Sequence, residues 1–203
     1  KMSKSKGNVV SPDDLVRDYG CDSLRMYELF VGPPELDAEW DDRGIDGVNR
    51  FLKRLWNMLM ESKEKDIQPT KEMIKLRHRM VYDITTRLES FSLNTVISGF
   101  MEYNNKFIEV AKKEGGIDKE TLETIAVLLS PFAPHFAEEM WEQLGHVDTV
   151  FKAGWPKYDE NEMKDDEIKI PVQINGKTKA VIEIPADISK DDAIAAGREA
   201  IAD

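Results

Sequence analysis

GIDGVNRFLKRLWNMLMESK, residues 44–63, carries the clearest helical pattern in this chain. Its apolar residues recur three and four positions apart, which places them on one face of a helix. These residues are Val48, Phe51, Leu52, Leu55 and Leu59. Arg50, Lys53 and Arg54 fall on the opposite face. Because an amphipathic helix gains most of its stability by burying its apolar face, the segment predicts a helix packed against other elements.

A second amphipathic helix is predicted from Lys71 to about Ser90. Its inner face is formed by Ile74, Val81, Ile84 and Leu88. Lys71, Lys75 and Arg79 follow at four-residue spacing and form a basic strip along the helix. Arg77 falls on the apolar side, where its aliphatic stem can pack while its charged end reaches outward. The two basic strips are candidate contacts for phosphate groups, although most such side chains on helix surfaces are simply solvated.

The helical periodicity continues through residues 96–111 and ends at Gly115-Gly116. Asp118 is the expected N-cap of the next helix. Two prolines then separate that helix from a last one over residues 136–144. Four or five amphipathic helices with short connections predict a mainly α protein, built as an antiparallel helical bundle.

The chain begins with Lys1-Met2-Ser3-Lys4-Ser5, a short loop that carries two ammonium groups among small hydroxyl side chains. Lysine supplies a mobile positive charge for phosphate oxygens, and such a loop can stabilise the charge that develops on a departing pyrophosphate. Ser11 and Pro12 then predict the start of a helix, Gly20 its end, and Asp22 the cap of the next helix. A capped helix directly after the loop argues against a disordered basic tail.

The end of the chain has a different composition. Residues 157–167 are acidic and lack periodicity, which predicts a linker. Beyond them, apolar and polar residues alternate on both sides of Asn175-Gly176, which predicts a β-hairpin. Ser189 and Asp192 form a capping box for one more helix. We expect these elements to form an incomplete α+β domain over 168–203, with a partly ordered tail or a strand edge that pairs with a neighbouring molecule.

Composition narrows the class of protein further. The chain has 203 residues with a 41% hydrophobic and a 33% charged share, which is typical of a globular protein long enough to bury a core. One cysteine favours a reducing compartment, and no apolar run approaches the roughly 20 residues of a membrane span, so we expect a cytoplasmic protein. Three scattered histidines have no ligand-spaced partners, so no metal site is predicted. A net charge of −11 opposes binding to a phosphate backbone, so any such binding must be local to the basic strips.

Lys1 to Ser5, with the stretch through Asp13, resembles the characteristic loop of class I aminoacyl-tRNA synthetases. Further segments narrow the resemblance to the bacterial-type leucyl-tRNA synthetases and run to the end of the chain. They are Pro33-Pro34-Glu35, Glu39-Trp40, Gly47, Arg50-Phe51-Leu52, Trp56, residues 131–135, Ala137-Glu138-Glu139, Trp141, Trp155-Pro156 and residues 172–177. The valine and isoleucine enzymes do not share the last of these motifs. The chain starts with Lys rather than Met, so we expect a carboxy-terminal part of a longer protein.

The resemblance implies a loop and stem-contact region over 1–42, a helical anticodon-binding-type domain over 43–156, and the truncated domain after the linker. It implies a ligase that joins leucine to ATP, accompanied by Mg, and transfers the leucine to tRNA(Leu). The ATP-binding loop would comprise Lys1, Met2, Ser3, Lys4 and Ser5. Lys4 is the first candidate for the catalytic cation and Lys1 the second. The candidate tRNA-binding residues are Arg50, Lys53, Arg54, Lys71, Lys75, Arg79 and Lys177.

Two alternatives remain open from the sequence. The first is a non-catalytic helical module that binds RNA or protein, in which the lysine-rich start has no role with ATP. The second is the corresponding part of a valyl, isoleucyl or methionyl enzyme. The nucleotide-binding fold and the His-containing element that class I enzymes also need do not occur in these residues, so we expect no aminoacylation and no tightly bound cofactor from this chain alone.

Overall fold

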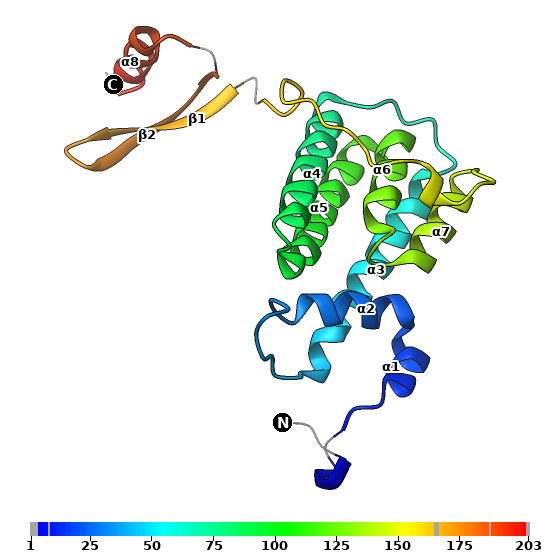
Figure 1. Cartoon of the computed structure of the whole chain (residues 1–203). Coiled ribbons are helices and arrows are strands. Elements are labelled where there is room, and N and C mark those ends of the chain that lie inside the picture. The colour runs from blue at the N-terminus through cyan, green and yellow to red at the C-terminus, as the bar shows by residue number, and fades with distance from the viewer. Residues whose placement is uncertain (1–3, 8, 165–166, 187, 202–203) are drawn as a thin grey trace. The chain divides into compact units, whose positions relative to one another are not determined.

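The computed structural model describes residues 4–7, 9–164, 167–186 and 188–201 (Figure 1). They divide into two compact units, Lys1–Glu162 and Met163–Asp203. The first unit is helical and the second combines a hairpin with a helix. The predicted mainly α fold, with a small α+β part after a helical bundle, is confirmed.

Two short helices lead into the bundle: α1 (Pro12–Tyr19) and α2 (Cys21–Phe30). As predicted, Ser11 is the N-cap of α1 and Pro12 its first residue. Gly20, with φ of +86°, ends α1 and precedes α2. The expectation that Asp22 caps α2 is wrong, because α2 already begins at Cys21 and the Asp22 carboxylate accepts a hydrogen bond from the backbone N–H of Phe136 instead.

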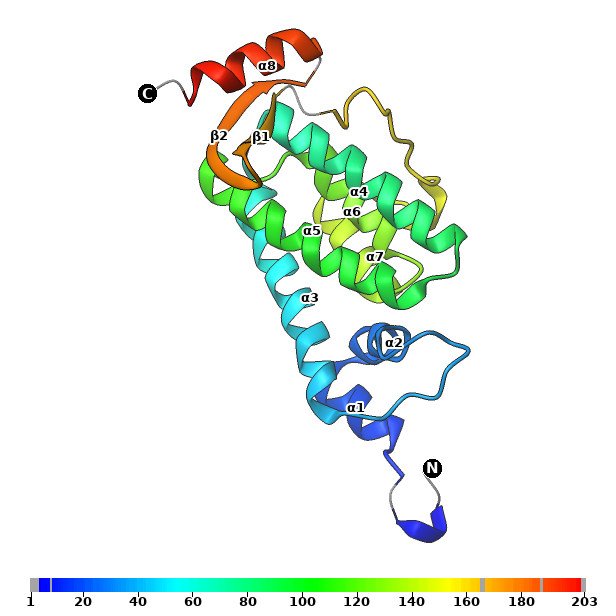
Figure 2. The same cartoon turned by 90° about the vertical axis from the view of Figure 1, so that its left-hand side faces the viewer.

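Five of the described helices form the bundle. They are α3 (Asp42–Ser62), α4 (Lys71–Glu89), α5 (Leu93–Glu114), α6 (Lys119–Leu129) and α7 (Pro134–Gln143). Figures 1 and 2 show α4 and α5 lying side by side, with α3 running past them towards α1 and α2. A short 3-10 turn, η2 (Val150–Lys152), packs against α6 and α7. The helices meet at one core, whose fully buried side chains include Met26, Leu55, Met80, Phe107, Leu128 and Met140.

Local sequence sets most of the helix ends. Side chains of Asp41, Thr70 and Asp118 accept hydrogen bonds from backbone N–H groups in the first turns of α3, α4 and α6. Gly115 ends α5 in the left-handed conformation, with φ of +84°, which costs a residue without a Cβ little. The predicted cap at Asp118 and the predicted end at Gly115-Gly116 are confirmed.

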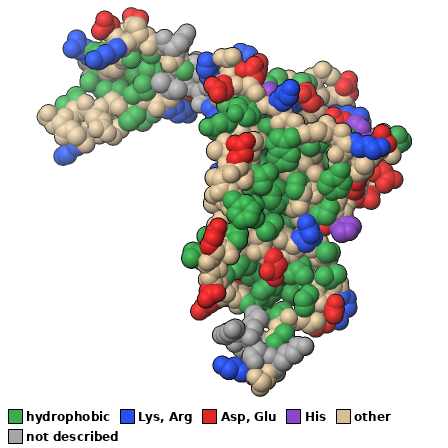
Figure 3. Space-filling view, viewed as in Figure 1, with side chains coloured by type: hydrophobic (Ala, Val, Ile, Leu, Met, Phe, Trp, Pro, Cys, Tyr) green, Lys and Arg blue, Asp and Glu red, His purple; other side chains and the backbone are tan. Residues whose placement is uncertain are grey.

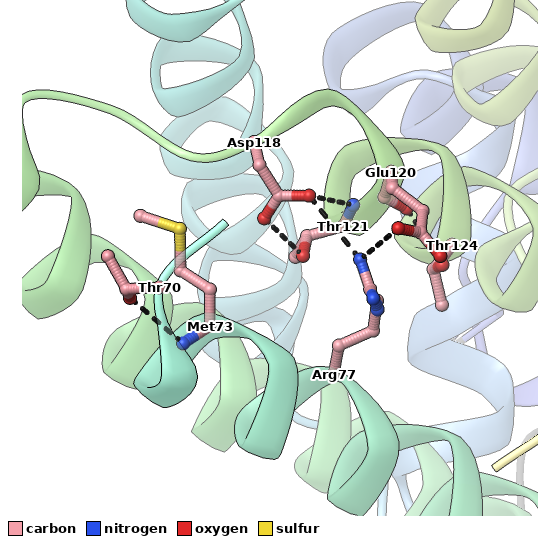
Figure 4. A network of polar contacts seen from close by, with 7 residues as sticks. All are labelled: Thr70, Met73, Arg77, Asp118, Glu120, Thr121 and Thr124. Carbon is pink, nitrogen blue, oxygen red and sulfur yellow. Dashed lines mark hydrogen bonds and ion pairs between the residues drawn. The ribbon is translucent and has the colours of Figure 1, made fainter. Parts of the chain in front are cut away.

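A buried ion pair joins α4 to α6 (Figure 4). Arg77 Nη1 lies 3.4 Å from Asp118 Oδ1 and 2.9 Å from Glu120 Oε2. Asp118 also accepts hydrogen bonds from the Thr121 N–H and hydroxyl. The expectation that the charged end of Arg77 reaches outward is wrong. The residue is 8% exposed, and its guanidinium pairs with Asp118, the N-cap residue of α6.

The segment after η2 lies along α4. The indole N–H of Trp155 donates to Thr85 Oγ1 at 2.9 Å, and the backbone N–H of Asp159 donates to His78 Nδ1 at 3.0 Å. The ring of Tyr158 contacts that of Tyr82 edge to face. The boundary between the two units follows Glu162, inside the segment predicted as a linker. The finer division into 1–42, 43–156, 157–167 and 168–203 stays a prediction.

The second unit is a hairpin with one helix. Strands β1 (Glu167–Ile174) and β2 (Lys177–Pro185) pair antiparallel, and Asn175 (φ +49°) with Gly176 (φ +77°) forms the predicted turn. Helix α8 (Lys190–Glu199) starts at the predicted cap, where Ser189 accepts a hydrogen bond from the Asp192 N–H. It contacts β2, and its buried Gly197 faces Val172 and Ile182.

Candidate functional site

The candidate phosphate-binding loop lies mostly outside the described residues. Lys1, Met2 and Ser3 are not described, and Lys4 is described only as the first backbone position of a short 3-10 turn, Lys4–Lys6. Within that turn the side chain of Ser5 is exposed. The geometry of this loop towards a phosphate group therefore stays a prediction.

The basic strip of α3 divides between two grooves. Arg50 is exposed, and its Nε donates to the Asp46 carbonyl on its own helix at 3.3 Å. Lys53 lines a groove of about 580 Å³ with residues of α2 and α7, whereas Arg54 lines another of about 230 Å³ against α5. The structure does not bring these three side chains to one surface.

The basic strip of α4, in contrast, gains partners from α5. Lys75 and Arg79 line a groove of about 390 Å³ between the two helices. On the opposite wall of this α4–α5 groove lie Lys106 and Lys113 of α5. Lys71, one turn before Lys75, is exposed at the start of α4. Two of the predicted residues thus line one wall of a groove that has a second basic wall, and the third lies one turn before them.

The α4–α5 groove is basic but contains carboxylates. Its lining has four cationic side chains against two anionic ones, Glu72 and Glu109. Lys113 Nζ lies 3.1 Å from Glu72 Oε2, and this hydrogen bond raises the pKa of Lys113. Lys106 Nζ lies 4.8 Å from the ring centroid of Tyr103, a cation–π contact. In a chain with a net charge of −11, the groove is a local surplus of positive charge.

Figure 3 shows that positive charge does not dominate the surface of the helical unit on the face in view. On the face in view, hydrophobic side chains cover much of the helical unit, and the described Lys and Arg residues there are scattered among Asp and Glu.

Lys177, the last candidate, is exposed at the first position of β2 in the second unit.

Sequence reasoning missed Lys106 and Lys113. Helical spacing relates residues of one helix and says nothing about which other helix lies beside it. The available signal was the recurrence of Lys106, Glu109 and Lys113 at three- and four-residue spacing, which places all three on one face of α5.

No metal centre or membrane span is found among the described residues. Over residues 4–7, 9–164, 167–186 and 188–201, no three His, Cys, Asp or Glu side chains gather as metal ligands would. Within the same ranges, every helix is too short or too polar to cross a bilayer.

Comparison with known proteins places the chain in a family. A family model for the anticodon-binding domain of tRNA ligases matches residues 70–194, and a model for class I tRNA synthetases of the I, L, M and V group matches residues 1–41. The chain therefore belongs to the tRNA ligases that carry this anticodon-binding domain.

Its curated relatives are leucine–tRNA ligases. The enzyme of Fervidobacterium nodosum is 47% identical over 208 residues, which is 95% of this chain and 25% of the relative. That of Thermotoga maritima is 44% identical, over 95% of this chain and 26% of the relative. The chain thus spans about a quarter of the length of these enzymes. The resemblance to leucyl-tRNA synthetases inferred from the sequence is confirmed.

A solved structure agrees over almost the whole chain. It is the agnB2 LeuRS of Agrobacterium radiobacter K84, in a ternary complex with tRNA and LeuAMS. The similarity has a TM-score of 0.82 at 28% identity and covers 98% of this chain and 28% of that one.

Proposed function

We propose that this chain serves a leucine–tRNA ligase, which activates leucine with ATP and transfers it to tRNA(Leu) in the cytoplasm. The main support is the match of about 95% of the chain to curated leucine–tRNA ligases, together with the class I synthetase model that matches residues 1–41. The chain would supply that loop and a helical surface for tRNA. The remaining three quarters of the relatives' length would supply the leucine site and the nucleotide fold.

The chemistry of the loop follows from its charge. As leucine attacks the α-phosphorus of ATP, negative charge accumulates on the departing pyrophosphate. Lys4, and secondarily Lys1, would stabilise this charge at the β and γ phosphates, while Met2, Ser3 and Ser5 complete the loop. Mg²⁺ would accompany the ATP phosphates. The described residues present no group of three acidic or histidine ligands, so we assign none of them to the ion.

Substitution of Lys4 tests this role. In the complete ligase, Lys4→Ala should slow leucine-dependent pyrophosphate exchange by on the order of 10²–10³, the usual effect of losing one donor to a developing charge. Lys6→Ala, an exposed lysine of the same turn, is the matched control and should stay within about twofold of the parent, since a solvated charge contributes little. An unchanged exchange rate in Lys4→Ala would remove the assignment and leave a non-catalytic tRNA-binding module as the better account.

We place the tRNA contact at the α4–α5 groove. Lys75 and Arg79 of α4 face a second basic wall across it, and Lys71 lies one turn before Lys75, so the cations could follow a phosphate backbone. Arg50, Lys53 and Arg54 would act separately, because Lys53 and Arg54 line different grooves and Arg50 is exposed outside both. Lys177 would contact tRNA from the hairpin of the second unit.

The hairpin could also mediate self-association. Its sheet contains two strands within the described residues, so each strand has an outer edge open to pairing. Val181 is 63% exposed on β2. We propose that an isolated chain pairs through such an edge, and sedimentation at increasing concentration tests it: a monomer at all concentrations contradicts the proposal.

A further inference from the structure

Helix α7 depends on another helix for its N-terminal cap. Its N-cap residue is Ala133, which has no side-chain acceptor, and its first residue, Pro134, has no N–H. The N–H of Phe136 in the first turn instead donates to Asp22 Oδ2 of α2 at 2.6 Å. Asp22 Oδ1 lies 2.9 Å from His135 Nδ1. The carboxylate that completes α7 thus comes from a residue 114 positions away.

A second contact from α2 reaches the same turn. Arg25, one helical turn after Asp22, donates from Nη2 to the Pro131 carbonyl at 3.2 Å. Pro131 follows the end of α6, and Asp22 meets the start of α7. Each charge therefore has the sign that the adjacent helix end favours: a cation near the C-terminus of α6 and an anion at the N-terminus of α7. Asp22 and Arg25 thus hold α2 against the α6–α7 turn at two points, and we call this pair of residues the clamp.

The burial of this clamp differs between its two members. Asp22 is 8% exposed, so its hydrogen bonds act where water competes little, whereas Arg25 is exposed. The ring of Trp56 on α3 packs edge to face against Phe136. The first turn of α7 is therefore in contact with both α2 and α3.

The clamp lies between the bundle and the N-terminal loop. Helix α2 follows α1 through the single residue Gly20, and residues 6–11 connect the loop to α1. A shift of α2 on the bundle would therefore carry α1 and the residues before it. We propose that Asp22 and Arg25 are positioning residues: by fixing α2 on the α6–α7 turn, they set the place of Lys1–Ser5 for adenylate formation. This inference rests on the proposed function of that loop.

The test compares the loss of two caps in the complete ligase. Asp22→Ala removes the acceptor for the N–H of Phe136, the third residue of α7. Thr70→Ala removes the acceptor for the N–H of Met73, the third residue of α4, but that cap is local and does not involve α2. Thermal unfolding of each variant establishes that it is folded at the assay temperature.

Pyrophosphate exchange, which needs no tRNA, is the readout that distinguishes positioning from stability. We expect Asp22→Ala to lower the kcat of exchange at least tenfold while the KM for leucine stays within twofold. Thr70→Ala should leave both within twofold. Asp22→Asn, which keeps an acceptor oxygen for the Phe136 N–H, should recover most of the lost rate, and Arg25→Met should show a smaller loss than Asp22→Ala.

Two outcomes overturn the inference: a kcat for Asp22→Ala within twofold of the parent, or an equal loss in Thr70→Ala, which would indicate general loosening. Lys4→Ala in the same assay separates the two proposals. If Lys4→Ala slows exchange and Asp22→Ala does not, the positioning role of Asp22 and Arg25 is contradicted, while the proposed role of the loop is retained. If Lys4→Ala is unchanged, the proposed function of the loop fails.

Discussion

Arg77 of α4 and Asp118, the cap of α6, form an ion pair in the interior of the bundle, with 3.4 Å between Nη1 and Oδ1. The side chains are 9% and 3% exposed. Removing one partner of a buried pair leaves the other charge desolvated, which typically costs about 3–5 kcal/mol. Helices α4 and α6 are therefore joined by an interaction whose removal should be costly.

Arg77→Met keeps the aliphatic stem but removes the charge. We expect it to lower the free energy of unfolding of the bundle by about 3 kcal/mol or more, because Asp118 stays buried without its cation. Urea unfolding followed by far-UV circular dichroism measures the change. Glu120→Gln is the control: its carboxylate also contacts Arg77 but is 69% exposed, so the loss should stay below about 1 kcal/mol. Equal stability of Arg77→Met and the parent would contradict a structural role for the pair.

Replacing each of two glycines of α3 with alanine should change the free energy of unfolding in opposite directions. A Cβ at Gly44 would lie 2.4 Å from Cε2 of the Tyr27 ring, whose hydroxyl is tied to the Asp41 carbonyl at 2.5 Å. Gly44→Ala should therefore destabilise the bundle, since overpacking costs about 1–3 kcal/mol and outweighs the gain in helix propensity. A Cβ at Gly47 meets nothing within 4 Å, so Gly47→Ala should gain up to about 1 kcal/mol. The midpoints of urea unfolding test both signs, and a stabilised Gly44→Ala would show that the ring moves freely.

Tyr103 should make the bundle sensitive to alkaline pH. Burial, together with its hydrogen bond to Asp83 Oδ2 at 2.5 Å, raises the pKa of the Tyr103 hydroxyl well above its ordinary value of 10.0. Above pH 10 the unfolded chain then loses this proton while the folded chain keeps it, so stability is full below pH 10 and falls as pH rises.

Tyr103→Phe isolates this contribution. One such group changes the free energy of unfolding by up to about 1.4 kcal/mol per pH unit. Between pH 10 and 11 the parent should lose about 1 kcal/mol more stability than Tyr103→Phe, as measured by urea unfolding at each pH. Parallel pH profiles for the two proteins would exclude Tyr103 as the cause.

The α4–α5 groove predicts a change in the salt dependence of tRNA binding. The double variant Lys75→Ala with Arg79→Ala should weaken binding of tRNA(Leu) to the complete ligase. It should also flatten the plot of log affinity against log salt by about 0.7–0.9 for each phosphate that the protein no longer neutralises. Lys119→Ala, which removes an exposed lysine of α6 paired with Glu123, is a control outside the groove and should leave the slope unchanged. An unaltered slope in the double variant would place the tRNA elsewhere.

Local features of this chain could be predicted from sequence because the interacting groups are close along the backbone. Ser11 with Pro12, Asp118, Gly115 and the Asn175-Gly176 turn all act within a few residues of their own position. The apolar spacing of α3 predicted both its length and its buried face. These features were sufficient for the fold class, whereas the family was inferred from the loop at Lys1–Ser5 and the further segments that resemble leucyl-tRNA synthetases.

Contacts between helices depended on the tertiary structure. Asp22 was expected to cap its own helix, α2, but its carboxylate caps α7. Arg77 was expected to extend its charged end into solvent, but it pairs with Asp118. Lys106 and Lys113 join the strip of α4 only because α5 lies beside it. A side chain's helical periodicity determines which face of its own helix it occupies. Its partner is determined by which other helix packs there, and that follows from burial of the whole core rather than from any one segment.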